Sequence, residues 1–270
     1  MQTHVSVPGR AHRADGARVI HRALPEEVPV ALVFNGTTQA VMMATPSDVE
    51  DFAHGFALTE GIVTDTAQIE AFEIAEHAQG IEARFWLRVD RAEALSERRR
   101  SMAGPVGCGL CGIDSLEQAL RTVPRVVADL YLSPAEISQA TEGLRDCQRL
   151  HHLTRATHAA GFLVPGAGVT LAREDVGRHN ALDKLIGALL LRGTGPATGA
   201  AVMTSRLSVE LVQKCALAGI PVLIAVSAPT GAAMRLADSA GITLVAFARS
   251  GGFDIYTHPH RISNEAAHVA

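Results

Sequence analysis

The sequence predicts an α/β protein in which a small α+β part precedes a larger part of alternating strands and helices. From about residue 159 onward, short apolar runs typical of buried strands alternate with segments of helical periodicity. This order favours a mostly parallel sheet that is covered by helices on both faces. Before residue 100, strand-like runs surround one amphipathic helix, which is the pattern of a smaller α+β unit.

The composition is that of a globular chain with a large core. Of its 270 residues, 47% are hydrophobic and 19% are charged, which allows one large domain or two modest ones. The net charge of −4 gives no global field that would recruit nucleic acid. Four cysteines are too few for a disulfide framework and favour a reducing compartment. Because no signal-peptide pattern or membrane-length apolar run occurs, we expect a cytoplasmic protein that binds neither nucleic acid nor a membrane.

The first elements are a loose tail and a hairpin. Residues 1–25 are polar and lack periodicity, so we expect a loose N-terminal tail. Residues 28–34 and 37–44 are apolar runs on either side of Asn35-Gly36. Because this dipeptide favours the tight turn between two strands, it predicts a β-hairpin.

A helix and a strand complete the smaller part. Thr45 is the expected N-cap, with Pro46 in the first turn and Gly61 as the stop signal. An apolar stripe at helical spacing lies between them. Residues 81–89 alternate apolar and polar side chains, which predicts a half-buried strand. The expected boundaries are thus a tail at 1–25, an α+β part at 26–130 that ends in a cysteine loop, and an α/β domain at 131–270.

The larger part begins with a capping box, Ser133 to Glu136, that starts a helix. Two strands joined by Pro165-Gly166 follow it. These two strands are expected at 159–164 and 169–172. The elements expected after them, in chain order, are a helix at 176–191, a strand at 200–204, a helix at 208–218, a strand at 222–226, a helix at 231–240 and a strand at 243–248.

The segment Gly107-Cys108-Gly109-Leu110-Cys111-Gly112 carries the clearest chemistry. Glycines free the backbone there, so this stretch predicts an exposed loop that can carry a thiol to a partner. The thiolate is the reactive form, and nearby cations would favour it. The arginines just upstream could supply that charge, although a solvated helix face is the plainer interpretation for most of them; they are Arg91, Arg98, Arg99 and Arg100.

Three other interpretations of Cys108 and Cys111 exist. A structural zinc site needs four ligands, and the two remaining cysteines are distant, although His151 and His152 near Cys147 leave this open. A thioredoxin-type dithiol normally opens a helix, which the glycines disfavour. A buried structural pair is the least compatible with three glycines. A thiol or persulfide carrier fits the pattern best, and we expect no bound metal.

Three predicted strand ends in the larger part carry hydroxyls, glycines and arginines: residues 205–208, 227–231 and 249–252. Ligands of alternating α/β folds bind beyond the carboxyl ends of strands, and helix N-termini attract phosphate. Each end alone is most simply a helix cap, whereas the three together favour a nucleotide-like site. His158 and His179 could be ligands, acid–base groups or core histidines. The chain lacks the H-x-E and P-C-x-x-C motifs of zinc deaminases.

These motifs together resemble the FdhD family, the formate dehydrogenase accessory sulfurtransferases. The resemblance rests on the cysteine loop and on further motifs in the same order, from about Val28 to the end of the chain. They are Thr157-His158-Ala159-Ala160, residues 174–184, residues 205–214, Ser227-Ala228-Pro229-Thr230 and Tyr256-Thr257-His258-Pro259. The family's fold implies a cytidine-deaminase-like three-layer α/β domain beside a smaller N-terminal α+β part.

The resemblance also implies a function. A cysteine desulfurase would hand sulfur to Cys108 as a persulfide, with Cys111 as its neighbour in the site. The sulfur would pass to the molybdenum of a bis(molybdopterin guanine dinucleotide) cofactor, which then enters formate dehydrogenase. The protein would be a homodimer. Two alternatives stay open: a chaperone that only shelters the cofactor, and a thiol–disulfide oxidoreductase.

The family's cofactor-binding segment corresponds here to Phe247, Ala248, Arg249, Ser250, Gly251 and Gly252. Gly252 stands where the family pattern carries a basic residue. We expect Arg249 to supply the positive charge of this segment instead.

Overall fold

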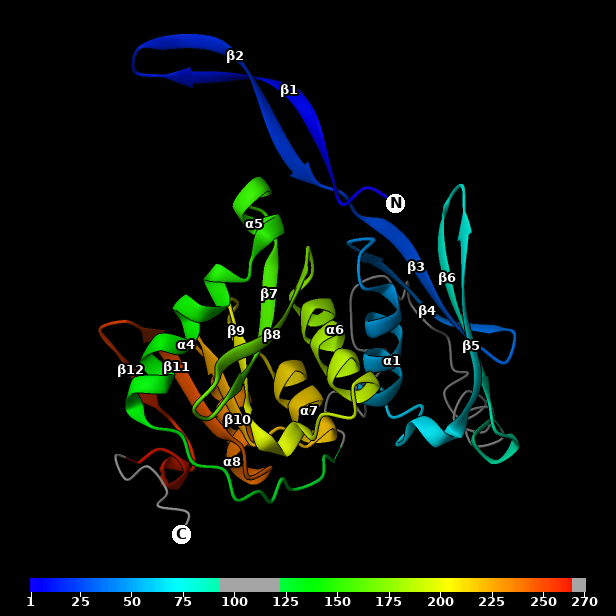
Figure 1. Ribbon diagram of the computed structural model, residues 1–270, viewed down its shortest axis with the longest axis vertical. Helices are drawn as coiled ribbons and strands as arrows, with labels where there is room; N and C mark the ends of the chain where they lie inside the picture. The colour runs from blue at the N-terminus through cyan, green and yellow to red at the C-terminus, as the bar shows by residue number, and fades with distance from the viewer. Residues whose placement is uncertain (93–121, 264–270) are drawn as a thin grey trace.

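The computed structural model describes residues 1–92 and 122–263 (Figure 1). Within these ranges the strands form a two-stranded, a four-stranded and a six-stranded sheet. The cysteine loop at 107–112 and the arginines at 98–100 lie outside the described residues. The boundary between the α+β part and the α/β domain, expected at 130, stays a prediction.

The N-terminal residues form a hairpin, so the expected loose tail is wrong. β1 (His4–Arg13) and β2 (Gly16–Pro25) pair antiparallel along ten residues, with Arg13 opposite Gly16. The polar composition concealed two strand signals. Asp15-Gly16 is a turn-forming dipeptide, and β-branched residues such as Val5 and Val19 suit extended backbone.

The four-stranded sheet has the order β4-β3-β6-β5. β3 (Val28–Phe34) and β4 (Thr37–Ala44) confirm the predicted hairpin, and Asn35 and Gly36 have positive φ angles of 47° and 74°. The strand expected at 81–89 is β6 (Gly80–Leu87). β5 (Ile69–His77) had no prediction, because alanines and glutamates blur its alternation.

The helix α1 (Val49–Thr59) covers one face of this sheet through Phe52 and Phe56. Its N-cap is Asp48, with a left-handed φ of 52°, so Thr45 is not the cap that its sequence context suggests. Thr45 is fully buried, and its hydroxyl accepts a hydrogen bond from the backbone N–H of Val176 at 3.1 Å. Because the Thr45 hydroxyl is engaged in this long-range hydrogen bond, it does not cap α1. A short 3-10 helix (Thr66–Gln68) leads from α1 into β5.

The six-stranded sheet has the order β12-β11-β10-β9-β7-β8 and is mixed. Only the β9–β10 and β10–β11 pairs are parallel, so the expectation of a mostly parallel sheet is wrong. β7 and β8 form a hairpin, and β12 folds back on β11. The strands are β7 (His158–Val164), β8 (Gly168–Asp175), β9 (Ala200–Met203), β10 (Val222–Ala225), β11 (Thr243–Arg249) and β12 (Gly252–Ile255).

Helices cover both faces of the mixed sheet, which confirms the three-layer α/β class. α4 (Pro134–Asp146) packs on one face, and α6 (Arg178–Leu191), α7 (Val209–Ala218) and α8 (Gly231–Ser239) cover the other (Figure 1). The predicted capping box starts α4, because Glu136 N–H donates to Ser133 Oγ at 3.3 Å. Shorter elements are α5 (Arg149–Thr154) and 3-10 helices at Pro196–Thr198 and Pro259–Arg261. Among the described helices, none is both long and apolar enough to cross a membrane.

The smaller part is joined to the α/β layers where α1 crosses α6. A Cβ added to Gly55 would lie 1.8 Å from the carbonyl oxygen of Asp183, and one added to Gly187 would lie 1.8 Å from that of Asp51. Both positions therefore require glycine for the helices to approach so closely. Arg173 on β8 adds an ion pair to Asp51, with Nε and Oδ2 at 2.6 Å.

Candidate functional site

The structure brings the three polar strand ends together at one edge of the six-stranded sheet. The Leu207 N–H donates to the Ala228 carbonyl at 3.1 Å, and the Thr230 N–H donates to the Leu207 carbonyl at 3.0 Å. The third end joins them through the Phe247 N–H, which lies 3.4 Å from the Ser227 carbonyl oxygen. We call these three segments, residues 204–208, 226–230 and 247–252, the carboxyl edge. The sequence predicted that these three strand ends lie together, and the hydrogen bonds between them confirm it.

The segment expected to bind the cofactor is a strained turn on this edge. Phe247 has a positive φ of 53°, and its side chain is 41% exposed. The pairing of β11 with β12 shifts register between Ala246 and Arg249, and the resulting bulge re-aims the backbone. Ala248 is buried in the core, whereas Arg249, Ser250 and Gly251 are exposed. Gly252 has a φ of 142°, a conformation that disfavours the basic residue of the family pattern.

The two helix starts on the carboxyl edge differ. At α8, the Thr230 hydroxyl accepts a hydrogen bond from the Ala233 N–H at 3.1 Å, so this start is an ordinary capped helix. At α7, Ser208 is the N-cap residue but makes no side-chain capping bond. The first turn of α7 already carries the acidic Glu210, whose carboxylate accepts a hydrogen bond from its own backbone N–H, so a further anion would meet a negative charge there.

Two histidines lie at the same edge of the sheet. His158 is the first residue of β7, and its ring Nδ1 lies 3.4 Å from the Thr204 hydroxyl oxygen. Burial lowers its pKa, and the charge of Arg178 lowers it further. His179 begins α6, with Nε2 3.6 Å from a Glu210 carboxylate oxygen. Burial, followed by Arg178 and Lys214, lowers the pKa of His179 to about 4. Both imidazoles are thus neutral near pH 7, a result that the sequence left open.

We expect His179 to titrate far below the ordinary histidine range. The unfolded chain takes up this proton near pH 6.5, whereas the folded protein holds the ring neutral down to about pH 4. The unfolded state therefore binds more protons in this window, and the stability of the fold falls as the pH is lowered from 6.5 to 4. The His179 ring resonances, which are assigned by comparison with the His179→Gln variant, should keep the chemical shifts of a neutral imidazole at pH 5.5. A midpoint near pH 6.5 would contradict this.

Other charged residues of the 174–184 motif are structural. Lys184 Nζ lies 2.7 Å from Asp175 Oδ2, and both side chains are fully buried. Asp175 also accepts from the backbone N–H of Thr45 at 3.0 Å, which joins the smaller part to β8. Asp183 pairs with Lys214 at 2.9 Å. These groups have no access to a substrate, so their role is to fix α6 against α1 and α7.

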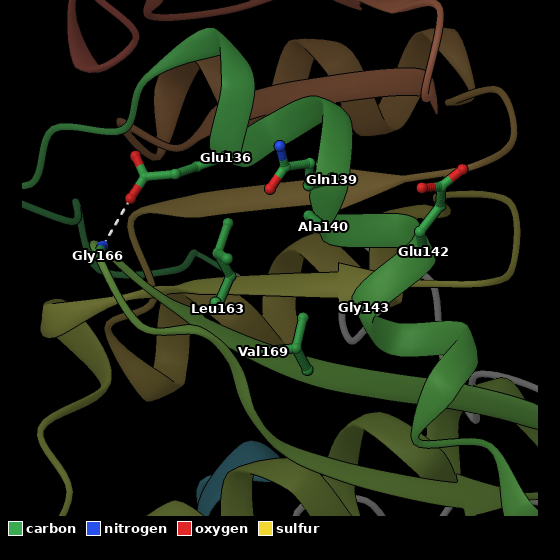
Figure 2. A pocket seen from close by; sticks show the side chains of 9 residues that line it. Glu136, Gln139, Ala140, Glu142, Gly143, Leu163, Gly166 and Val169 are labelled. Atoms are coloured by element: carbon green, nitrogen blue, oxygen red, sulfur yellow. Dashed lines mark hydrogen bonds between the residues drawn. The ribbon is translucent and has the colours of Figure 1, made fainter.

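A pocket of about 510 Å³ lies away from the carboxyl edge, between α4 and the β7–β8 turn (Figure 2). Glu136 is its most buried acid group, and Figure 2 shows it turned toward Gly166. Its Oε1 accepts from the Gly166 N–H at 2.6 Å, and its Oε2 accepts from Ser133 at 2.8 Å. Because both oxygens already serve structural bonds, this pocket offers little chemistry.

Two cysteines, Cys147 and Cys215, lie within the described residues. Cys147 caps α4 and is exposed, whereas Cys215 is buried in α7. Burial raises the pKa of the Cys215 thiol to about 12, which makes it a poor nucleophile. No group of three metal-ligating side chains occurs among residues 1–92 and 122–263. Because Cys108 and Cys111 lie outside those ranges, their distance from the carboxyl edge and the absence of metal stay predictions.

Comparison with known proteins places these features in a family. A sequence profile of the FdhD/NarQ family matches residues 25–263. The sulfur carrier protein FdhD of Agrobacterium fabrum is 53% identical over 242 residues, which cover 89% of each chain. The protein of the same name from Brucella abortus is 53% identical over 253 residues, covering 93% of this chain and 94% of the relative.

A solved structure agrees with the sequence relatives. It is a crystal structure from Desulfotalea psychrophila, provisionally assigned as a formate dehydrogenase accessory protein. Its sequence is 26% identical, its TM-score is 0.78, and the alignment covers 97% of this chain and all of the other. The profile match includes the carboxyl edge, and each of the two relatives aligns over about nine-tenths of the sequence. The chain therefore belongs to the FdhD/NarQ family.

Proposed function

We propose that this protein is a sulfur carrier that accepts sulfur as a persulfide on Cys108 and delivers it to a molybdenum cofactor. The observation that supports this most strongly is the similarity over about nine-tenths of the chain to relatives named sulfur carrier protein FdhD. The glycine-flanked pair Cys108 and Cys111 supplies the thiols that such a carrier needs.

In the first step, the Cys108 thiolate attacks the outer sulfur of a persulfide on a cysteine desulfurase. The S–S bond of the donor breaks, the donor leaves as a thiolate, and a new S–S bond forms on Cys108. The reaction is an exchange between sulfurs and needs no external oxidant. Glycines on both sides of Cys108 leave the backbone free to reach the donor.

In the second step, the Cys111 thiolate attacks the inner sulfur of the Cys108 persulfide. A Cys108–Cys111 disulfide forms, and the outer sulfur leaves as hydrosulfide, which has gained the two electrons that the thiol pair lost. Hydrosulfide then exchanges with an oxygen ligand of the molybdenum in the substrate, and that oxygen leaves as hydroxide. A cellular thiol reductant afterwards restores the dithiol.

The carboxyl edge is the proposed site for the nucleotide end of the bis(molybdopterin guanine dinucleotide) substrate. The exposed Arg249 carries a guanidinium that can form two parallel hydrogen bonds to a phosphate. His158 and His179, whose pKa values are lowered by burial and by the charge of Arg178, add neutral hydrogen-bonding groups to this edge.

GDP should bind to the protein without molybdenum, and Arg249→Ala should weaken this binding. A charge-assisted contact suggests a loss of roughly 1.5–3 kcal/mol. Arg249→Lys should lose less, because the charge remains although the planar fork is gone. Calorimetry on the three proteins measures this order. Equal affinities in all three, or no GDP binding by the natural protein, would remove Arg249 from the site while leaving the sulfur chemistry of the loop intact.

Transfer itself is tested with protein that has been loaded with sulfur and then separated from its donor. The protein is incubated with a cysteine desulfurase and cysteine, repurified, and added to an extract from a strain that lacks it. Formate dehydrogenase activity should rise only with the loaded form. A cofactor chaperone would act equally well without loading. A thiol–disulfide oxidoreductase would act after oxidation of the loop pair, with no sulfur added.

A further inference from the structure

Two sequence motifs that the sulfur chemistry does not use meet where α6 and α7 begin. Arg178 and His179 are the first two residues of α6, and Glu210 lies in the first turn of α7. The two helices lie side by side (Figure 1). Across this contact, His179 Nε2 lies 3.6 Å from a carboxylate oxygen of Glu210. The motifs at residues 174–184 and 205–214 therefore form one polar cluster beside the carboxyl edge.

The polar atoms of this cluster are incompletely paired. His179 Nε2 and Ser208 Oγ are both shielded from solvent, and neither has a hydrogen-bond partner among residues 1–92 and 122–263. Buried polar atoms in folded proteins are nearly always hydrogen-bonded. Two unpaired atoms beside one carboxylate therefore point to a missing partner at this position.

Glu210 is the hydrogen-bond acceptor of the cluster. Its side chain is 37% exposed, so a ligand can reach it. Burial raises the pKa of its carboxyl, but Ser208, the backbone N–H of Glu210 itself and the charge of Arg178 outweigh burial and hold the pKa below its usual value. The group is therefore a carboxylate at neutral pH, which accepts hydrogen bonds and donates none. The start of α7 suits a ligand with N–H donors for the same reason that it disfavours an anion.

Arg178 is the hydrogen-bond donor of the cluster. After burial, its charge is the next cause that lowers the pKa values of His158 and His179, and it also acts on Glu210. The guanidinium thus lies among residues of β7, α6 and α7, and it can only donate hydrogen bonds. A ligand that fits both Arg178 and Glu210 must carry N–H donors next to a carbonyl oxygen.

The 2-amino-4-oxopyrimidine ring has such an edge, with an amino group, a ring N–H and a carbonyl oxygen in a row. Guanine and pterin both contain this ring, and the substrate of the proposed function carries both. Adenine has neither the ring N–H nor the carbonyl oxygen on the corresponding edge. The cluster is therefore complementary to guanine and pterin and not to adenine.

The position of the cluster relative to Arg249 is compatible with one bound nucleotide. α7 follows β9, Arg249 is the last residue of β11, and β10 lies between these two strands in the sheet. Neighbouring strands are about 4.8 Å apart, so the ends of β9 and β11 are separated by about 10 Å. A nucleoside diphosphate is long enough to place its base at one of these ends and its phosphates at the other.

We propose that Glu210 and Arg178 recognise the 2-amino-4-oxopyrimidine edge of the substrate. Glu210 accepts hydrogen bonds from the ring N–H and the amino group, and Arg178 donates to the carbonyl oxygen. The inference rests on the proposed function, which places the nucleotide end of the cofactor on the carboxyl edge. It adds to that function the residues that select the base, whereas Arg249 binds the phosphates of any nucleotide.

Calorimetry with GDP and xanthosine diphosphate (XDP) tests the role of Glu210. Xanthine has a carbonyl oxygen where guanine has the amino group, and in the natural protein that oxygen would face a carboxylate. The natural protein should therefore bind GDP at least about tenfold more tightly than XDP. In Glu210→Gln the side-chain amide can donate to the xanthine oxygen, so the preference should reverse in favour of XDP. A variant that had lost its fold would not gain affinity for XDP.

Three further variants show whether this effect belongs to the base. Arg249→Ala should weaken GDP and XDP by the same factor, because the two ligands carry the same phosphates. Arg178→Gln should also weaken both, because both carry the carbonyl oxygen that Arg178 binds. Glu142→Gln makes the same chemical change as Glu210→Gln at an exposed acid of α4, and it should alter neither affinity.

6-Hydroxymethylpterin is the probe for pterin as the source of the same edge. If it binds, Glu210→Gln weakens it and GDP does not bind, then the cluster recognises pterin, and only the nucleotide site at Arg249 fails. GDP binding without a preference over XDP, or a preference that is unchanged in Glu210→Gln, would overturn the inference while leaving the Arg249 site intact. Absence of binding by both GDP and the pterin would overturn it as well.

Discussion

Cys108→Ser is expected to abolish maturation of the client formate dehydrogenase while leaving the fold unchanged. The serine hydroxyl cannot hold a sulfur as a persulfide, so the carrier would have no cargo. A thiol in a glycine-flanked loop contributes little packing, so the denaturation midpoint should not change. The measurement is formate dehydrogenase activity in a deletion strain that expresses the variant. Full activity in that strain would exclude Cys108 as the carrier.

The two described cysteines provide matched controls for this substitution. Cys147→Ser alters an exposed thiol at the end of α4, and Cys215→Ser alters a buried one in α7. Both variants should keep client activity, because neither thiol belongs to the loop. Cys215→Ser should also lower the stability of the fold somewhat, because it places a hydroxyl in the core. Sulfur transfer by the folded protein should be unaffected. Loss of sulfur transfer in either folded variant would show that the reactive thiol has been assigned to the wrong segment.

Lys184→Met is expected to cause the largest loss of stability of any change considered. It leaves the Asp175 carboxylate fully buried without its cationic partner, which lies 2.7 Å away in the natural protein. Removing one member of a buried pair typically costs roughly 3–5 kcal/mol. The free energy of unfolding from urea denaturation measures this. The expected consequence is a separation of the smaller part from α6, because Asp175 also binds the backbone of Thr45.

A double variant and a surface control make this test specific. In Lys184→Met/Asp175→Asn the buried charge is gone, so the combined loss should be smaller than the sum of the two single losses. Arg84→Met removes a cation from the exposed pairs with Glu73 and Glu82, and it should change stability far less. Equal effects of Lys184→Met and Arg84→Met would mean that the buried pair does not hold the two parts together.

Local signals in the sequence were sufficient for most of the predicted elements in both parts. The capping box at Ser133 and the turn at Asn35-Gly36 act through neighbouring residues, and the structure contains both. The sequence failed where a distant contact decides the outcome. Thr45 looks like an N-cap, but it is buried against β8, and its hydroxyl binds Val176. Nothing within one helical turn of Thr45 contains that information.

The direction of the strands and the N-terminal β1–β2 hairpin are the other features that the sequence predicted wrongly. Alternation of strands and helices predicts parallel neighbours, yet the β7–β8 hairpin places β7 antiparallel to β9. The order of elements does not specify which strand a hairpin joins. A projecting two-stranded hairpin has no buried face, so residues 1–25 show no alternation of apolar and polar side chains. The sequence therefore suggested an unstructured tail. The Asp15-Gly16 dipeptide was the signal that could have revealed it.

The part of the candidate site that could be predicted is the meeting of neighbouring strand ends at one edge of the sheet. Ser227 and Phe247 come from neighbouring strands, and the expectation that their ends meet is confirmed by their hydrogen bond. The low pKa of His179 was not predictable, because it depends on burial and on Lys214 from another helix. The arrangement of Cys108 relative to this edge stays a prediction, since the loop lies outside the described residues.

The most direct test of the sulfur-carrier proposal is the mass of the peptide that holds Cys108. The protein is incubated with a cysteine desulfurase and cysteine, digested without reductant, and analysed by mass spectrometry. The proposal predicts a gain of about 32 Da, one sulfur atom, on Cys108, which added reductant removes. An unmodified Cys108 peptide, or the added sulfur on Cys147 instead, would contradict it.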